Sequence, residues 1–190
     1  MVKQKFSKIN KIAFLDRDGV INVDLMTYVT CPEEFEAIEG SLEAIAALTT
    51  NGYKIAIATN QACIEKEIIS EEELRRVHDH MIDLLMELGG QIDYIAFCPH
   101  APESNCKCRK PEVGLLQEIE EELKISLKGK FFIGDKSSDM EAGRRFGCTP
   151  LLIKKGGYGE KVFRTENSPP DEQCFDGLND AVNYILKQEA

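Results

Sequence analysis

The sequence predicts an α/β fold, a three-layer sandwich in which helices cover both faces of one parallel sheet. Short apolar runs alternate with amphipathic stretches along the chain, and this alternation is typical of successive strand-helix-strand units. No Ser/Gly linker, repeat or low-complexity block interrupts it. We therefore expect a single domain spanning 1–190, with no insertion long enough to form a large cap domain.

Five short runs are expected to be the strands. They are rich in Ile, Phe and Tyr and are bounded by turn residues, which favours buried parallel strands. The runs are residues 11–15, 53–59, 92–98, 130–134 and 150–153. The segment 166–176, with its Pro169-Pro170 pair, is expected to be a surface connection.

Helix-start signals lie between these runs. Ser41 is placed to cap a helix that Asn51-Gly52 closes, and Ser70 with Glu73 forms the spacing of a capping box. Apolar residues at helical spacing predict three more helices. These cover residues 116–123, 140–146 and 178–186.

The charge and the cysteine content of the chain restrict which molecules it can bind and in which compartment it folds. With 23 Lys+Arg against 33 Asp+Glu the net charge is -10, so we expect no nucleic-acid or membrane partner, and an anionic substrate needs a local basic patch or a metal. The basic segment 1–11 precedes only four apolar residues, too few for a signal peptide. Seven cysteines, three of them crowded beside a histidine, fit a reducing compartment. We expect a cytoplasmic monomer.

Two acids follow the first strand. Ligands of open parallel sheets bind beyond the carboxyl ends of the strands, so Asp16 and Asp18 are expected to face a site. Residues two apart on an extended chain project to the same side, which leaves Arg17 pointing elsewhere. A magnesium ion would offset the repulsion between the two carboxylates. The alternative is an acidic turn with Gly19 as its hinge.

Polar residues also follow the second and fourth strands. Thr59, Asn60 and Gln61 can donate hydrogen bonds to phosphate oxygens. Asp135 and Asp139 straddle a helix start, where one carboxylate can reach a metal and the other can support a ligand or a lysine.

A cysteine-histidine cluster follows the third strand. It offers three thiolates and one imidazole, a complete tetrahedral set for a structural zinc ion. Its members are Cys98, His100, Cys106 and Cys108. Arg109 and Lys110 follow directly, so zinc binding would order the loop 98–108 and fix this basic patch. The alternative is an unliganded surface loop.

These strand-end residues together resemble the haloacid dehalogenase (HAD) superfamily of phosphatases. The resemblance implies a HAD-like fold and a covalent mechanism in which Asp16 attacks phosphorus. Asp18 would protonate the leaving oxygen and then act as the base that hydrolyses the aspartyl-phosphate. Lys110 and Thr59 would hold the transferring phosphoryl oxygens.

The same resemblance implies a magnesium site. The Asp16 carboxylate, the Asp18 backbone carbonyl and Asp135 would hold the ion, with Asp139 in support. Lys136 is assigned to the substrate-binding side.

The C-P-H…C-x-C-R-K-P loop is similar to that of D-glycero-D-manno-heptose 1,7-bisphosphate 7-phosphatases and the related histidinol-phosphate phosphatases. The segment 22–29 resembles the heptose branch, which implies that Asp24 and Tyr28 contact the sugar, and the resemblance implies that Arg109 helps to select the substrate. Residues 60–67 depart from the family: they read N-Q-A-C-I-E-K-E where N-Q-S-G-I-x-R-G is usual.

Two alternatives therefore stay open. One is histidinol phosphate as the substrate, and the other is a non-catalytic module that binds a phosphosugar or phosphopeptide. Two further features receive plain interpretations. His78 and His80 lie two apart on a predicted helix and cannot share a metal, and residues 156–159 are expected to form a mobile loop at the rim of the site.

Overall fold

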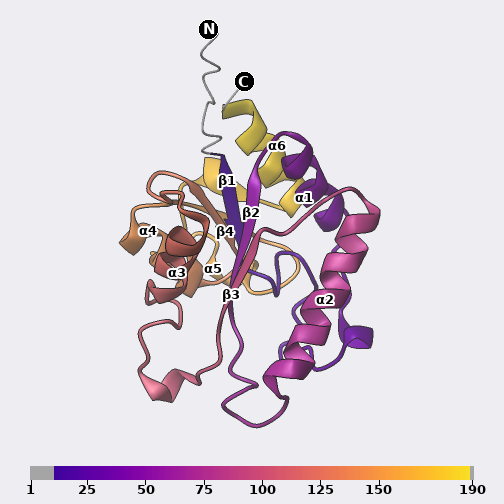
Figure 1. Ribbon diagram of the computed structural model, residues 1–190. Helices are drawn as coiled ribbons and strands as arrows, with labels where there is room; N and C mark the ends of the chain where they lie inside the picture. Colours follow the sequence, from indigo (N-terminus) through magenta and orange to yellow (C-terminus); the bar gives the residue numbers. More distant parts are fainter. Residues whose placement is uncertain (1–10, 189–190) are drawn as a thin grey trace, which may run out of the picture.

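The computed structural model describes residues 11–188, so all but the last residue of the basic segment 1–11, and both ends of the expected domain, lie outside the described residues. Within this range six strands form one sheet in the order β3-β2-β1-β4-β5-β6, and Figure 1 labels the first four strands of the chain. Every neighbouring pair is parallel. The strands are β1 Ile12–Leu15, β2 Lys54–Asn60, β3 Tyr94–Cys98, β4 Phe131–Gly134, β5 Thr149–Ile153 and β6 Cys174–Phe175.

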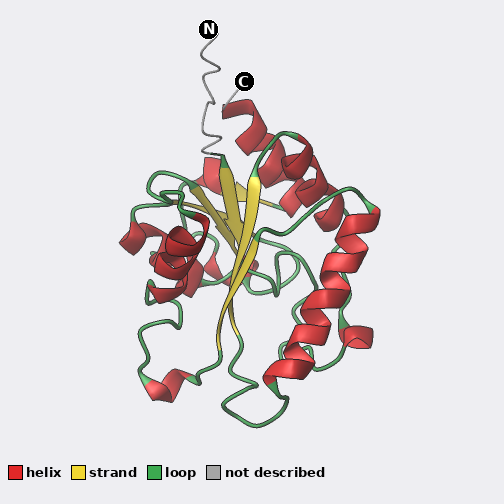
Figure 2. Cartoon of the chain, in the orientation of Figure 1, coloured by secondary structure: helices red, strands yellow, loops and turns green. Residues whose placement is uncertain are grey.

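Helices cover both faces of this sheet (Figure 2), which confirms the predicted three-layer α/β fold. One face carries α1 (Ser41–Thr50), α2 (Glu71–Glu87) and α6 (Leu178–Gln188), and the other carries α3 (Gly114–Leu123) and α4 (Ser137–Phe146). The described residues also form α5 (Gly159–Val162) and short 3-10 turns at Pro32–Glu34, Pro102–Ser104 and Asp171–Gln173.

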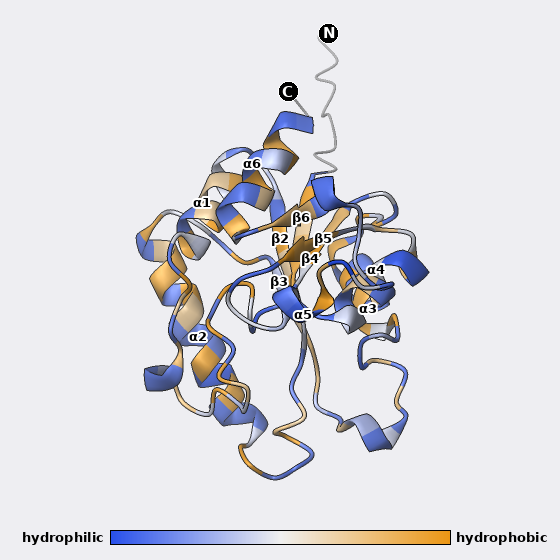
Figure 3. Cartoon of the chain, turned by 180° about the vertical axis from the view of Figure 1, so that it is seen from behind, coloured by the Kyte–Doolittle hydropathy of each residue, from blue (hydrophilic) through white to orange (hydrophobic). Residues whose placement is uncertain are grey.

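Strand β1 shows why the apolar runs are unbroken. Ala13 and Leu15 pack under α1, α2 and α6, whereas Ile12 and Phe14 pack under α3 and α4, because successive side chains of a strand point to opposite faces. Both faces are buried, so neither tolerates polar residues. In Figure 3 the strands are accordingly orange, whereas the long helices mix orange and blue along their length.

The helix starts confirm one predicted cap and correct another. The capping box is present: Glu73 N donates to Ser70 Oγ at 3.2 Å, and Ser70 N donates to Glu73 Oε2 at 2.7 Å. Ser41 is not the cap of α1. Gly40, with φ of 79°, occupies that position, and the buried Ser41 hydroxyl instead donates to the carbonyl of Ile21 at 2.6 Å.

The prediction of five strands was wrong by one. Cys174–Phe175, inside the expected surface connection, pairs with Leu152 and Ile153 of β5. Two residues are too few to produce an apolar run, so this edge strand leaves no pattern in the sequence.

No helix within residues 11–188 is long and apolar enough to cross a membrane.

The strand order creates a switch point between β1 and β4. From β1 the chain proceeds toward one edge of the sheet, and from β4 it proceeds toward the other edge. Ligands of such sheets bind at this switch point, beyond the carboxyl ends of β1 and β4.

Candidate active site

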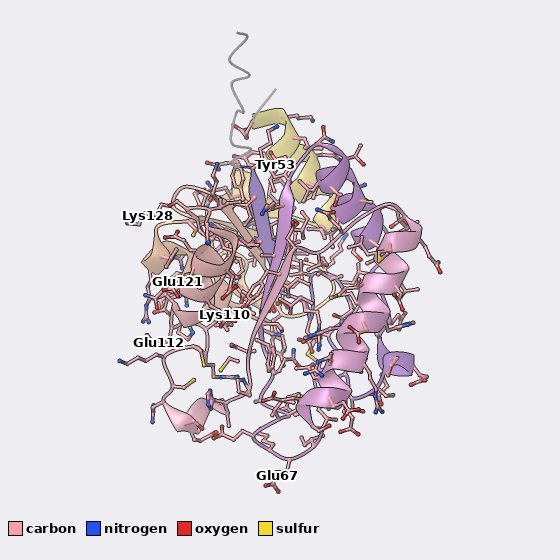
Figure 4. The ribbon with its side chains drawn as sticks, in the orientation of Figure 1. Tyr53, Glu67, Lys110, Glu112, Glu121 and Lys128 are labelled. Carbon is pink, nitrogen blue, oxygen red and sulfur yellow. The ribbon has the colours of Figure 1, made fainter. Side chains whose placement is uncertain are left out.

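Four buried charged side chains meet at the switch point. Asp16 follows β1, Asp135 follows β4, and Asp139 lies in the first turn of α4, with carboxylate oxygens all within 4.8 Å of one another. The Lys110 Nζ lies 3.1 Å from Asp16 Oδ1 and 2.6 Å from Asp139 Oδ1, and it donates to the carbonyl of Ala58 at 2.6 Å. Figure 4 places Lys110 at the lower end of the sheet. We call these four side chains the site floor.

The site floor contains three carboxyl groups and one ammonium group, all buried from solvent. Burial raises the pKa of Asp16, against the opposing Lys110 cation, and raises that of Asp135 well above its ordinary value. Burial would lower the pKa of Lys110, but Asp139 and Asp16 outweigh it and raise that pKa. Asp135 Oδ1 is buried without a hydrogen-bond partner. This oxygen lies 4.0 Å from Lys136 Nζ, and a buried carboxylate oxygen without a hydrogen bond, beside two further carboxylates, fits a divalent cation with oxygen ligands.

Asp18 is held by a residue that we expected to point away. The Arg17 side chain is 1% exposed, and its Nη2 lies 2.8 and 2.9 Å from the two Asp18 carboxylate oxygens, while Nη1 lies 3.2 Å from His78 Nε2. Burial would raise the pKa of Asp18, but Arg17 and a hydrogen bond from Asn22 lower it to about 2. Asp16 and Asp18 line the cleft and Arg17 does not, as the alternation predicted, but the alternation did not predict that the Arg17 guanidinium bonds to the Asp18 carboxylate.

The residues after β2 divide into two groups. Thr59 and Asn60 line the cleft, and the Asn60 side chain both accepts from Lys110 N, at 3.1 Å, and donates to Lys110 O, at 3.2 Å. Gln61 does not line the cleft, which corrects the expectation that it donates to phosphate. Its amide donates instead to Asp18 Oδ2 at 3.0 Å and to Thr59 Oγ1 at 2.8 Å. Gln61 therefore holds the side chains of Asp18 and Thr59 in place without facing the cleft.

The cleft above the site floor has a volume of about 1320 Å³. All four remaining predicted substrate-side residues line it: Asp24, Tyr28, Arg109 and Lys136. Asp24 Oδ2 and Lys136 Nζ form an ion pair at 2.9 Å. Sequence reasoning missed Ser138, which also lines the cleft and lies in the first turn of α4.

The glycine-rich segment 156–159 touches the site floor. Tyr158 lines the cleft, and its backbone N donates to Asp135 Oδ2 at 2.7 Å. Gly157 and Gly19 both pack so closely on the Asp135 carboxylate that neither position has room for a Cβ atom. The segment borders the site as expected, but it is hydrogen-bonded to Asp135 and to the turn after β1, where Asp24 N donates to Gly156 O at 2.9 Å.

The cysteine-histidine cluster assembles as the spacing predicted. Cys98 Sγ lies 3.6 Å from His100 Nδ1 and 3.6 Å from Cys106 Sγ, and Cys108 Sγ lies 3.1 to 3.4 Å from the other three ligand atoms. Burial opposes ionisation of Cys106, but the Arg109 N–H and neighbouring thiols lower its pKa to about 7. All the cysteines are free thiols. Three sulfur atoms and one imidazole nitrogen at these separations fit a tetrahedral zinc ion.

Comparisons with known proteins agree with this geometry. A family model described as "HAD-hyrolase-like" matches residues 107–181. The D-glycero-beta-D-manno-heptose-1,7-bisphosphate 7-phosphatase of Pseudomonas putida is 40% identical over 168 residues, covering 88% of this chain and 95% of that protein. Its Pseudomonas aeruginosa counterpart is 38% identical over 178 residues, 93% and 98% of the two chains.

A solved structure extends the similarity to three dimensions. The crystal structure of D,D-heptose 1,7-bisphosphate phosphatase from Bordetella bronchiseptica, complexed with magnesium and phosphate, matches with a TM-score of 0.89 at 36% identity. The match covers 95% of this chain and 99% of that one.

Proposed function

Because the chain belongs to the D-glycero-D-manno-heptose-1,7-bisphosphate 7-phosphatase family of HAD-like phosphatases, we propose that it removes the 7-phosphate of a heptose 1,7-bisphosphate through an aspartyl-phosphate. The observation that supports this most directly is the site floor itself. It brings the Asp16 carboxylate and the Lys110 ammonium group together at the base of a cleft of about 1320 Å³, with the buried carboxylates of Asp135 and Asp139 beside them.

Asp16 is the proposed nucleophile. Its backbone N is anchored by the carbonyl of Ile133 at 2.8 Å, and its Oδ1 accepts from Arg17 N at 2.7 Å. These contacts hold the carboxylate at the strand end and leave Oδ2 to attack phosphorus. The Asp16–phosphorus bond forms as the bond from phosphorus to the sugar oxygen breaks.

Asp18 is the proposed acid and base. With a pKa of about 2 it is ionised in the free protein at neutral pH. A phosphate group beside it would raise that pKa by like-charge repulsion, and the proton that Asp18 gives to the leaving oxygen would come from solvent as the substrate binds. The resulting carboxylate then takes a proton from the water that hydrolyses the aspartyl-phosphate, which regenerates Asp16. Lys110 and the Thr59 hydroxyl stabilise the phosphoryl oxygens.

Two metals complete the proposal. Asp16, Asp135 and the Asp18 backbone carbonyl would hold magnesium, with Asp139 in support, and the four side chains of the loop 98–108 would hold zinc. Magnesium would neutralise the charge that otherwise repels a phosphate from a carboxylate. Zinc, with four protein ligands, would be structural.

The decisive test is hydrolysis by purified protein of a heptose 1,7-bisphosphate, with histidinol phosphate as the competing substrate and with or without magnesium. We expect magnesium-dependent phosphate release and a higher kcat/KM for the heptose. Asp16→Asn should lower kcat by at least about 10⁴-fold with the fold intact, because it removes the nucleophile. Asp83→Asn, an exposed change on α2, serves as the control. Preference for histidinol phosphate would move the substrate to the other branch, and no phosphate release from either would favour a binding module.

A further inference from the structure

The loop that departs from the family pattern makes contacts of its own. Residues 62–67 follow β2, and their Glu65 side chain reaches across to the loop 98–108. Glu65 Oε2 accepts from the backbone N of Ala101 and, at 2.5 Å, from the Ser104 hydroxyl. Glu65 N also donates to Pro99 O at 3.1 Å. Within the described residues, this one carboxylate therefore bonds to the loop 98–108 at two separate points.

The peptide group between His100 and Ala101 connects Glu65 to the substrate side. Its N–H donates to the Glu65 carboxylate, and its carbonyl accepts from Arg109 Nη1 at 3.0 Å. In a trans peptide the N–H and the carbonyl point in opposite directions. Glu65 and Arg109 thus hold one peptide plane from opposite sides, and a rotation of that plane would break both hydrogen bonds. The Glu65 carboxylate and the Arg109 guanidinium are both charged, which makes each of these hydrogen bonds stronger than one between neutral groups.

We propose that Glu65 is a positioning residue that orients the Arg109 guanidinium toward the cleft through the His100–Ala101 peptide. The inference rests on the proposed function, in which Arg109 contacts the substrate. Arg109 lines the cleft, whereas Glu65 does not, so Glu65 acts through another residue. Hydrogen bonds from Ser104 and Ala101 hold the pKa of Glu65 below its ordinary value, which keeps it ionised at neutral pH.

The chain offers a matched control in the same loop. Glu67 is exposed, and in Figure 4 it projects away from the body of the protein at the tip of the loop. Glu67→Gln removes the same charge as Glu65→Gln without touching the loop 98–108. Any effect of the net charge alone would appear equally in both variants.

Kinetics on the heptose bisphosphate test the positioning role. Glu65→Ala should raise KM about fivefold and change kcat less than about twofold, because it disturbs binding and not the nucleophile. Glu65→Gln keeps one acceptor oxygen and should recover part of the loss. In an Arg109→Ala background, Glu65→Ala should have no further effect on KM. Additive effects, or an unchanged KM in Glu65→Ala, would overturn the proposal, as would loss of zinc from that variant.

A second measurement does not depend on the substrate. Amide hydrogen exchange of residues 99–104 should accelerate about tenfold in Glu65→Ala and stay unchanged in Glu67→Gln. If the bisphosphate is not hydrolysed but exchange accelerates, the proposed function fails while the contact to the loop 98–108 stands. If exchange is unchanged, the positioning role is refuted whatever the substrate.

Discussion

The site floor and the loop 98–108 are held in place by different forces. Asp16 and Asp135 directly follow strands that are buried on both faces, and they are 3% and 0% exposed. The loop lies at the opposite extreme: it extends away from the sheet (Figure 1), and residues 102–105 are exposed. The hydrophobic core therefore positions the site floor, whereas hydrogen bonds and proposed metal ligands position the loop. Damage to the loop should harm binding before it harms the fold.

Lys110 belongs to both regions. Along the chain it follows the loop directly, yet its ammonium group is buried in the site floor between Asp16 and Asp139. The Asn60 side chain hydrogen-bonds to both the backbone N–H and the backbone carbonyl of Lys110. Ordering of the loop is thereby transmitted to the group that would stabilise the transferred phosphate.

Replacement of Lys110 should have the largest effect. Lys110→Met keeps most of the packing but leaves two buried carboxylates without their cation. We expect kcat to fall about 10²- to 10³-fold and the free energy of unfolding of the metal-free protein to fall by roughly 3 kcal/mol. Steady-state kinetics and urea unfolding measure the two effects, with the exposed Lys128→Met (Figure 4) as the control. Normal stability in Lys110→Met would show that the floor is not an electrostatic unit.

Loss of a zinc ligand should separate the two regions. In Cys106→Ser we expect the bound zinc to disappear and kcat/KM to fall at least about tenfold, because Arg109 and Lys110 lose their support. The melting temperature should fall only modestly, since the sheet is built elsewhere. Metal analysis and calorimetry test this, with Cys174→Ser outside the cluster as the control. Full activity in Cys106→Ser would break the link between zinc and the basic patch.

Lowering the pH should reduce the free energy of unfolding by protonating Asp18. The pKa of Asp18 is about 2 in the folded protein, below its value of about 3.9 in an unfolded chain. Its contribution, about 2 to 3 kcal/mol, is therefore complete above about pH 4 and is lost as the pH falls through 2. Urea unfolding of metal-free protein should show this loss in the wild type and a flatter pH profile in Asp18→Asn. Parallel profiles would contradict the assigned pairing with Arg17.

The smallest effect is expected at His78. The histidine is buried, and burial followed by the Arg17 charge lowers its pKa to about 3, so the neutral ring accepts from Arg17. His78→Leu should cost about 1 to 2 kcal/mol by leaving that donor unpaired, and His78→Gln, which keeps an acceptor, should cost less. Chemical unfolding measures both, with His80→Gln as the control. Equal losses in the two His78 variants would assign the histidine to packing.

Much of the local structure could be predicted from the sequence because it depends on local patterns. The apolar runs predicted the five longer strands, and the Ser70/Glu73 spacing predicted a cap that the structure confirms. The Cys98 to Cys108 spacing likewise predicted the ligand cluster, since the four residues lie close along the chain. Asp16 and Asp135 were predicted to meet because parallel strands end at a common edge.

Contacts between segments that are distant in the sequence could not be predicted from these local patterns. The sequence alone did not indicate that Arg17 returns to Asp18 and meets His78 on α2, or that Gln61 braces Asp18 instead of facing the cleft. Nor did it indicate that β6 pairs with the edge of β5. Glu65 is the clearest example: it occupies the position that the family pattern leaves open, so the pattern assigns it no role, and only the approach of two loops gives its carboxylate the Ala101 amide to bind. Local spacing determines which elements form and which groups end them, whereas the partners of each polar side chain are decided by how those elements pack.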